Sequence, residues 1–98
     1  MEEKEKIDTS TYQKDKAIIY VTNYGQYMDT MYVLTNANYT WARGQSLLSL
    51  IYWKGNTESI TLIIYMNSKK VTWREHDTRR NYPHFREMKP EELKYMLF

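Results

Sequence analysis

Residues 74–85, REHDTRRNYPHF, gather side chains that could do chemistry. Three arginines, both histidines of the chain and a tyrosine lie in this short stretch. A histidine or tyrosine can move the 2′-hydroxyl proton of RNA, and an arginine can stabilise the charge that grows on the phosphate. No family signature accompanies these residue types, so a solvated, non-catalytic loop is the preferred interpretation. The residues that a small metal-independent ribonuclease would use are His76, Arg79, Arg80, Tyr82 and His84.

The sequence offers no pattern for a metal ion or a cofactor. His76 and Asp77 are adjacent and His84 lies beyond Pro83, which matches no zinc or calcium motif. The chain has no cysteine, and its three isolated glycines cannot form a phosphate-binding loop. We therefore expect no metal, no cofactor and no enzymatic activity.

The same region also suggests a nucleic-acid-binding surface. Residues 69–98 carry eight bases and five acids, so the basic character of the chain lies in its last third. Bases interspersed with aromatic side chains can hold the phosphates and stack the bases of a single strand. Glu75, Asp77 and Glu87 interrupt this patch, and an ordinary solvated edge is an equal alternative. The candidate residues within 69–89 are Lys70, Arg74, His76, Arg79, Arg80, Tyr82 and Arg86.

The ten tyrosines of the chain suggest a third activity, the binding of another protein. Tyrosine supplies large, stiff and half-polar contact area and is enriched at interfaces. The stretch TNYGQYMDTMY holds tyrosines and methionines with a single charge, although half of them would face inward on a strand. The candidate docking residues are Tyr24, Tyr27, Met28, Met31 and Tyr32.

Short apolar runs separated by turn residues predict a sheet that positions these side chains. Residues 17–22 and 27–34 are expected to be the two strands of a hairpin. Asn23 and Gly25 can supply the positive φ that the turn between them requires. Residues 39–43 predict a short third strand.

Two further strands are expected in the second half of the chain. Residues 58–66 are mostly apolar, and residues 69–76 alternate between polar and apolar side chains. Two turn residues separate these segments. In the second of them Val71 and Trp73 share one face, which indicates a strand with one face exposed to solvent. Residues 44–54 fit either a helix or a strand. The strand is favoured because the Gly–Asn pair that follows could turn directly into the next strand.

The two ends of the chain differ in pattern. Residues 1–16 lack apolar periodicity and predict a flexible tail, whereas residues 90–97 predict a helix with proline at its first position. Residues 17–98 would then form one mainly β domain. We expect a small antiparallel sheet or a partly open barrel of five to six strands, closed by the C-terminal helix. If residues 44–54 are helical, the order becomes ββαββα and the fold α+β.

The leading hypothesis is a small non-catalytic protein that binds another protein. Chains of this size and composition are often accessory or inhibitor proteins of viruses or mobile elements. Nucleic-acid binding through residues 69–89 and a homodimer formed through strand edges are the alternatives, and a ribonuclease is the least favoured. No secretion signal or membrane-length apolar run is visible, so we expect a soluble, intracellular, cytoplasmic protein with no membrane partner.

Overall fold

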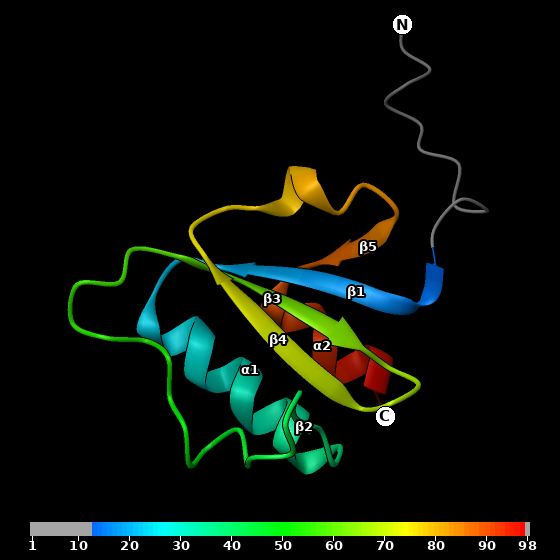
Figure 1. Cartoon of the computed structure of the whole chain (residues 1–98), viewed down its shortest axis with the longest axis horizontal. Helices are drawn as coiled ribbons and strands as arrows, with labels where there is room; N and C mark the ends of the chain where they lie inside the picture. Colours follow the sequence, from blue (N-terminus) through cyan, green and yellow to red (C-terminus); the bar gives the residue numbers. More distant parts are fainter. Residues whose placement is uncertain (1–12, 98) are drawn as a thin grey trace, which may run out of the picture.

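The computed structural model describes residues 13–97, and the side chains of residues 15–93. Figure 1 shows the strands and helices that these residues form. The elements are β1 (Gln13–Val21), α1 (Tyr24–Asn36), β2 (Thr40–Trp41), β3 (Ile60–Tyr65), β4 (Lys70–Glu75), the 3₁₀ helix η3 (Arg79–Asn81), β5 (Phe85–Met88) and α2 (Pro90–Leu97). Of the predicted tail 1–16, residues 1–12 lie outside the described residues, and residues 13–16 belong to β1.

The five strands form one mixed sheet in the order β2-β4-β3-β1-β5. The three central strands are antiparallel, since β3 pairs antiparallel with both β1 and β4. The outer strands are parallel to their neighbours, β2 to β4 and β5 to β1. Each outer strand follows a crossover connection, α1 in one case and the segment 76–84 in the other, which explains the parallel pairing. The prediction of a β-rich chain with five strands and a C-terminal helix is therefore confirmed. The prediction that the sheet or barrel is simply antiparallel is wrong.

Helix α1 occupies the residues for which the sequence predicts the second strand of a hairpin, so that prediction is wrong. Asn23 is extended (φ −153°, ψ 165°), and its side chain accepts a hydrogen bond from the backbone N–H of Gln26 at 2.8 Å. This bond caps the helix start. The buried residues of α1 recur at helical spacing, at positions 27, 30, 31 and 34. Asparagine suits a turn and a helix cap equally, so the same residue is compatible with both structures.

The segment 42–59 is neither the strand nor the helix that the sequence allows. Its backbone is held by short turns, such as the bond from Ser49 N to Ser46 O, and by bonds to side chains of other elements. Leu47 is fully buried and anchors the segment to the core. These bonds satisfy several backbone groups of the segment without a strand partner. The alternative order ββαββα is therefore wrong as well, whereas the α+β class predicted with it fits a sheet accompanied by two α-helices.

The two helices cover one face of the sheet. Alternate residues of β1 and β3, such as Ile19 and Leu62, point into a core that also holds Met31 and Leu34 of α1 and Leu93 of α2. All five of these side chains are fully buried. The predicted C-terminal helix runs from Pro90 to Leu97 and packs against α1 and β1.

The segment 76–84 covers the opposite face of the sheet. The side-chain hydroxyl of Thr61 on β3 donates to His76 O at 2.8 Å and accepts from Thr78 N at 3.0 Å. Ile18 and Ile63 lie on this face and are almost wholly buried. The basic motif identified in the sequence therefore closes the second side of the sheet.

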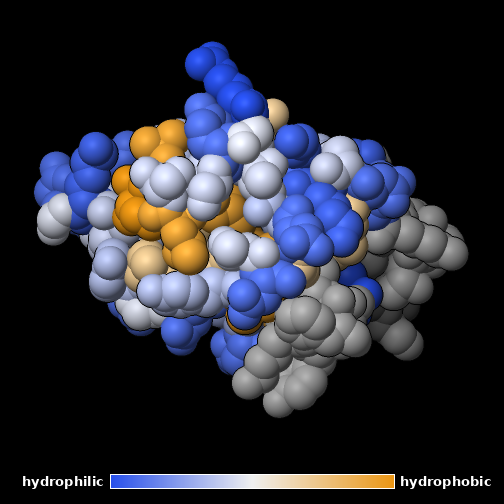
Figure 2. All heavy atoms as spheres, turned by 90° about the horizontal axis from the view of Figure 1, so that it is seen from below, coloured by the Kyte–Doolittle hydropathy of each residue, from blue (hydrophilic) through white to orange (hydrophobic). Residues whose placement is uncertain are grey.

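The surface over α1 and the segment 42–59 is mostly hydrophilic. Figure 2 looks at the molecule from this side and shows one hydrophobic area among hydrophilic residues. Leu48, Leu50 and Ile51 of the segment are only partly buried. Within residues 13–97, no helix has both the length and the apolar character needed to cross a bilayer.

Candidate binding groove along strand β4

Strand β4 has an outer edge that is paired over only its first two residues. β2 pairs with it at Lys70 and Val71, and the chain then leaves the sheet. On the other side, β3 pairs with β4 along its whole length, from Lys70 to Glu75. The outer edge is therefore open from Thr72 to Glu75.

Two hydrogen bonds at the ends of β4 show which backbone groups face this open edge. His76 N donates toward β3, to Ser59 O at 2.9 Å, whereas Lys69 O accepts a bond from β2 at 3.1 Å. Successive residues of a strand direct their N–H and C=O groups to opposite sides. The N–H and C=O groups of Trp73 and Glu75 therefore point outward, where no strand pairs with them.

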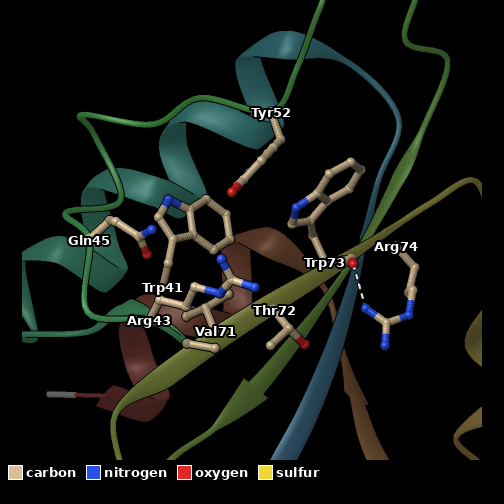
Figure 3. Close-up of a pocket in the computed structure, with 9 residues that line it drawn as sticks. Trp41, Arg43, Gln45, Tyr52, Val71, Thr72, Trp73 and Arg74 are labelled. Atoms are coloured by element: carbon tan, nitrogen blue, oxygen red, sulfur yellow. Dashed lines mark hydrogen bonds between the residues drawn. The ribbon is translucent and has the colours of Figure 1, made fainter.

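Two hollows lie against the open edge and share Tyr52 and Trp73, and together we name them the β4 groove. The larger hollow, of about 380 Å³, lies between β4 and the start of the segment 42–59 (Figure 3). Besides the shared residues, its main lining side chains are Trp41, Arg43, Gln45, Thr72 and Arg74. The smaller hollow, of about 220 Å³, adds Lys54, Asn56, Thr57, Ile60 and Glu75.

Three aromatic rings form the apolar wall of the groove. Tyr52 lies between the two indoles, as Figure 3 shows. Its ring centroid is 4.5 Å from that of Trp73 in a stacked arrangement and 4.8 Å from that of Trp41 in an edge-on arrangement. Such pairs contribute roughly 0.5–1.5 kcal/mol each beyond the area that they bury. The wall is therefore a rigid, preformed surface.

Hydrogen bonds from other elements fix the segment that carries Tyr52. The indole Nε1 of Trp41 donates to Leu50 O at 2.9 Å, and Tyr52 N donates to the hydroxyl of Tyr27 on α1 at 2.9 Å. Burial raises the pKa of the Tyr27 hydroxyl, so this group stays neutral. The helix thus positions one side of the groove, and the sheet positions the other.

The larger hollow carries positive charge. Arg43 and Arg74 line it, and no acidic residue does. Among the side chains of residues 15–93, no acid lies within ion-pair distance of either arginine. Arg74 Nη1 instead donates to Trp73 O at 2.8 Å, the bond drawn in Figure 3. The groove can therefore offer backbone hydrogen bonds, an aromatic surface and two guanidinium groups to one ligand.

The residues predicted to dock a protein are divided between the core and the surface of α1. Tyr27 and Met31 are fully buried, and Met28 is partly buried against the core. Tyr24 and Tyr32 are 54% and 53% exposed. Of the predicted set, Tyr27 contributes to the groove, through its bond to the backbone of Tyr52.

The residues predicted to bind nucleic acid lie on two different surfaces. Lys70 and Arg74 belong to β4. Lys70 lies in the part that β2 pairs, where its Nζ donates to Thr40 Oγ1 at 3.1 Å, and Arg74 lies on the open edge and lines the larger hollow. Arg79 lies over the opposite sheet face, 4.4 Å from the ring of Tyr20. The other predicted nucleic-acid-binding residues lie near Arg79 in the sequence. Tyr82 packs against Phe85. The remaining three are exposed: His76, Arg80 and Arg86.

Arg79 forms ion pairs with two acidic side chains. The partners are Asp77, at 2.7 Å, and Glu87. Hydrogen bonds from Arg79 hold the pKa of Asp77 at about 2, below its ordinary value of 3.8. The same two partners raise the pKa of Arg79. The centre of the predicted basic patch is thus a structural ion-pair network.

Both histidines lie at the surface. His76 and His84 are exposed, and the one ionic neighbour of His76 among the described residues is Glu75, at 4.0 Å. His76 adopts a left-handed φ of 68°, where β4 ends. No group of three potential metal ligands occurs in the part of the chain that the structure describes.

Half of the groove residues lie in the segment 42–59, whose structure the sequence leaves open, and the other half lie on strands. Arg43, Gln45 and Tyr52 flank a stretch in which Ser, Gly and Asn interrupt Leu, Tyr and Trp. That mixture is typical of an irregular segment with buried aromatic anchors, and it is the one sequence signal that points to the groove.

Comparison of the chain with protein-family models, with curated proteins and with solved structures gives no match.

Proposed function

We propose that this protein is a non-catalytic binding protein that accepts an extended segment of another protein as an added strand on β4. The observation that carries this proposal is the unpaired edge of β4 facing a preformed aromatic groove. An open strand edge is a template for another strand, and main-chain hydrogen bonds then supply affinity. Side chains at alternate positions of the added strand would enter the groove.

The dimensions of the edge fit a short segment. The open stretch Thr72–Glu75 offers four residues, or roughly 13 Å of strand at about 3.3 Å per residue. Two hollows of about 380 and 220 Å³ lie beside it. An interface of this size is small, and we expect a transient complex with an affinity in the range of about 1–100 µM.

Single-stranded nucleic acid is the second candidate for the same groove. Arg43 and Arg74 beside an aromatic wall are the groups that hold phosphates and bases. The stacked faces of Tyr52 and Trp73 are in contact with each other, however, so they are not available to a base. This contact favours the extended peptide.

A proline substitution tests the peptide proposal directly. Glu75→Pro removes an outward N–H of β4 and leaves the ladder to β3 unchanged, because Glu75 does not bond toward β3. Peptides of about eight residues selected from a random displayed library would be titrated against this variant and against Glu75→Ala. We expect Glu75→Pro to weaken binding by about two- to tenfold, the loss of one main-chain hydrogen bond, and Glu75→Ala to bind as the wild type does.

Two results would overturn the proposal. The first is a library selection that yields no binding peptide. The second is a set of peptides that bind Glu75→Pro and Glu75→Ala equally well. Binding to an oligothymidine that weakens steeply with salt, and that Arg43→Ala abolishes, would establish the nucleic-acid alternative in its place.

A further inference from the structure

Arg74 covers an acceptor that an added strand would need. Its guanidinium donates to the carbonyl of Trp73, which points to the open edge (Figure 3). A strand that pairs with β4 would place one of its own N–H groups on this oxygen. Arg74 therefore competes with an added strand for this oxygen.

The chemistry of guanidinium groups determines which peptide can displace Arg74 from the Trp73 carbonyl with the smallest loss of free energy. A guanidinium binds a carboxylate through two parallel charge-assisted hydrogen bonds, which are about twice as strong as a neutral one. Arg74 is exposed and has no acidic neighbour within ion-pair distance among residues 15–93. A carboxylate on the peptide would replace the bond that Arg74 gives up, whereas an amide or apolar side chain would replace it poorly or not at all.

The charge of the larger hollow favours the same ligand. Arg43 lies in its wall together with Arg74, and no acid lines it. In the smaller hollow Lys54 and Glu75 have opposite charge. The positive charge is thus confined to the part of the groove next to the Trp73 carbonyl.

We infer that the β4 groove selects an acidic extended segment, and that Arg74 determines this specificity by moving from the Trp73 carbonyl to a carboxylate of the ligand. This inference rests on the proposed function, since it concerns the segment that the open edge binds. Arg74 acts in two opposite ways in this account. It disfavours neutral strands by covering an acceptor, and it favours acidic strands by pairing with them.

Three fluorescein-labelled peptides of about eight residues test the inference, with valine alternating with glutamate, glutamine or lysine. Fluorescence anisotropy would measure their affinity for the wild type, for Arg74→Ala and for Arg80→Ala. We expect the wild type to bind the glutamate peptide about tenfold more tightly than the glutamine peptide, and the lysine peptide most weakly. In Arg74→Ala, the glutamate peptide should bind more weakly and the glutamine peptide more tightly than in the wild type.

Arg80→Ala is the matched control, because Arg80 is an exposed arginine of η3 that does not line the groove. Arg80→Ala should keep the wild-type preference for the glutamate peptide. If both Arg74→Ala and Arg80→Ala lost this preference, it would reflect the overall charge of the protein and contradict the inference. Equal binding of the glutamate and glutamine peptides to the wild type would overturn the role of Arg74 and leave the proposed function standing. If no peptide bound to either the wild type or Arg74→Ala, the proposed function itself would fail.

Discussion

At the scale of single residues, Arg79 shows how a motif that resembles an active site can be structural. Its side chain joins Asp77, Glu87 and the ring of Tyr20. These contacts hold the segment 76–84 against the sheet face that buries Ile18. Residue types alone could not reveal this, because one of the acids that occupy Arg79, Asp77, lies inside the motif and the other, Glu87, lies after it.

The carboxylate of Asp77 gives this network a defined pH dependence. Its pKa is lowered from 3.8 to about 2 in the folded protein, chiefly by hydrogen bonds from Arg79. A lowered folded-state pKa means that the stabilisation is complete above the unfolded value and is lost as the pH falls through about 2. The side chain of Asp77 is 41% exposed, so solvent screening keeps the effect small.

We expect Asp77→Asn to be less stable than the wild type at pH 7, and the difference between the two to vanish near pH 2. Urea unfolding at several pH values between 7 and 2 would measure both free energies. Glu58→Gln is the control, since no hydrogen bond or ion pair of the described residues involves the Glu58 carboxylate. A difference between Asp77→Asn and wild type that stays constant with pH would contradict the assignment.

Tyr27 is the second residue with a specific structural role, which its hydroxyl performs. It accepts the backbone N–H of Tyr52 and so connects α1 to the aromatic wall of the groove. Tyr27→Phe keeps the buried ring and leaves that N–H without its partner, which we expect to cost about 1 kcal/mol in the free energy of unfolding.

Urea unfolding and the amide exchange of Tyr52 would measure the effect of Tyr27→Phe. The matched control is Tyr32→Phe, because the Tyr32 ring is 53% exposed on the same helix. We expect the control to change neither quantity. Equal behaviour of the two variants would show that the bond from Tyr52 does not hold the segment 42–59.

At the scale of the elements, the sequence predicts those parts whose pattern has one physical interpretation. The apolar run 58–66 and the alternating run 69–76 contain β3 and β4, and their pairing follows from the short turn between them. The C-terminal helix follows from its proline and acidic first turn. In each case local pattern and tertiary position agree.

Helix α1 and the segment 42–59 could not be predicted in the same way. The apolar residues of 27–34 fit both a strand and a helix, and the decisive feature is the face that Tyr27, Met31 and Leu34 bury together. The segment 42–59 is held by side chains of Trp41 and Tyr27, and such bonds leave no periodic trace in a sequence. The groove was missed for the same reason, because it forms where this segment leaves β2.

At the scale of the whole molecule, both faces of the sheet are covered, and β4 keeps part of its outer edge unpaired. Helices α1 and α2 cover one face and the segment 76–84 covers the other. β2 protects β4 over two residues only, and the segment that follows forms the far wall of a groove rather than a longer strand. A longer β2 would have closed the edge, so its shortness is what makes an added strand sterically available.

Amide hydrogen exchange along β4, with and without a selected peptide, tests the central claim most directly. In the free protein we expect the amides of Thr72 and Arg74 to exchange slowly, since they bond to β3, and those of Trp73 and Glu75 to exchange quickly. Saturating peptide should slow exchange at Trp73 and Glu75 and leave Thr72 and Arg74 unchanged. If Trp73 and Glu75 are already protected in the monomeric free protein, or stay unprotected in the peptide complex, then β4 does not accept an added strand.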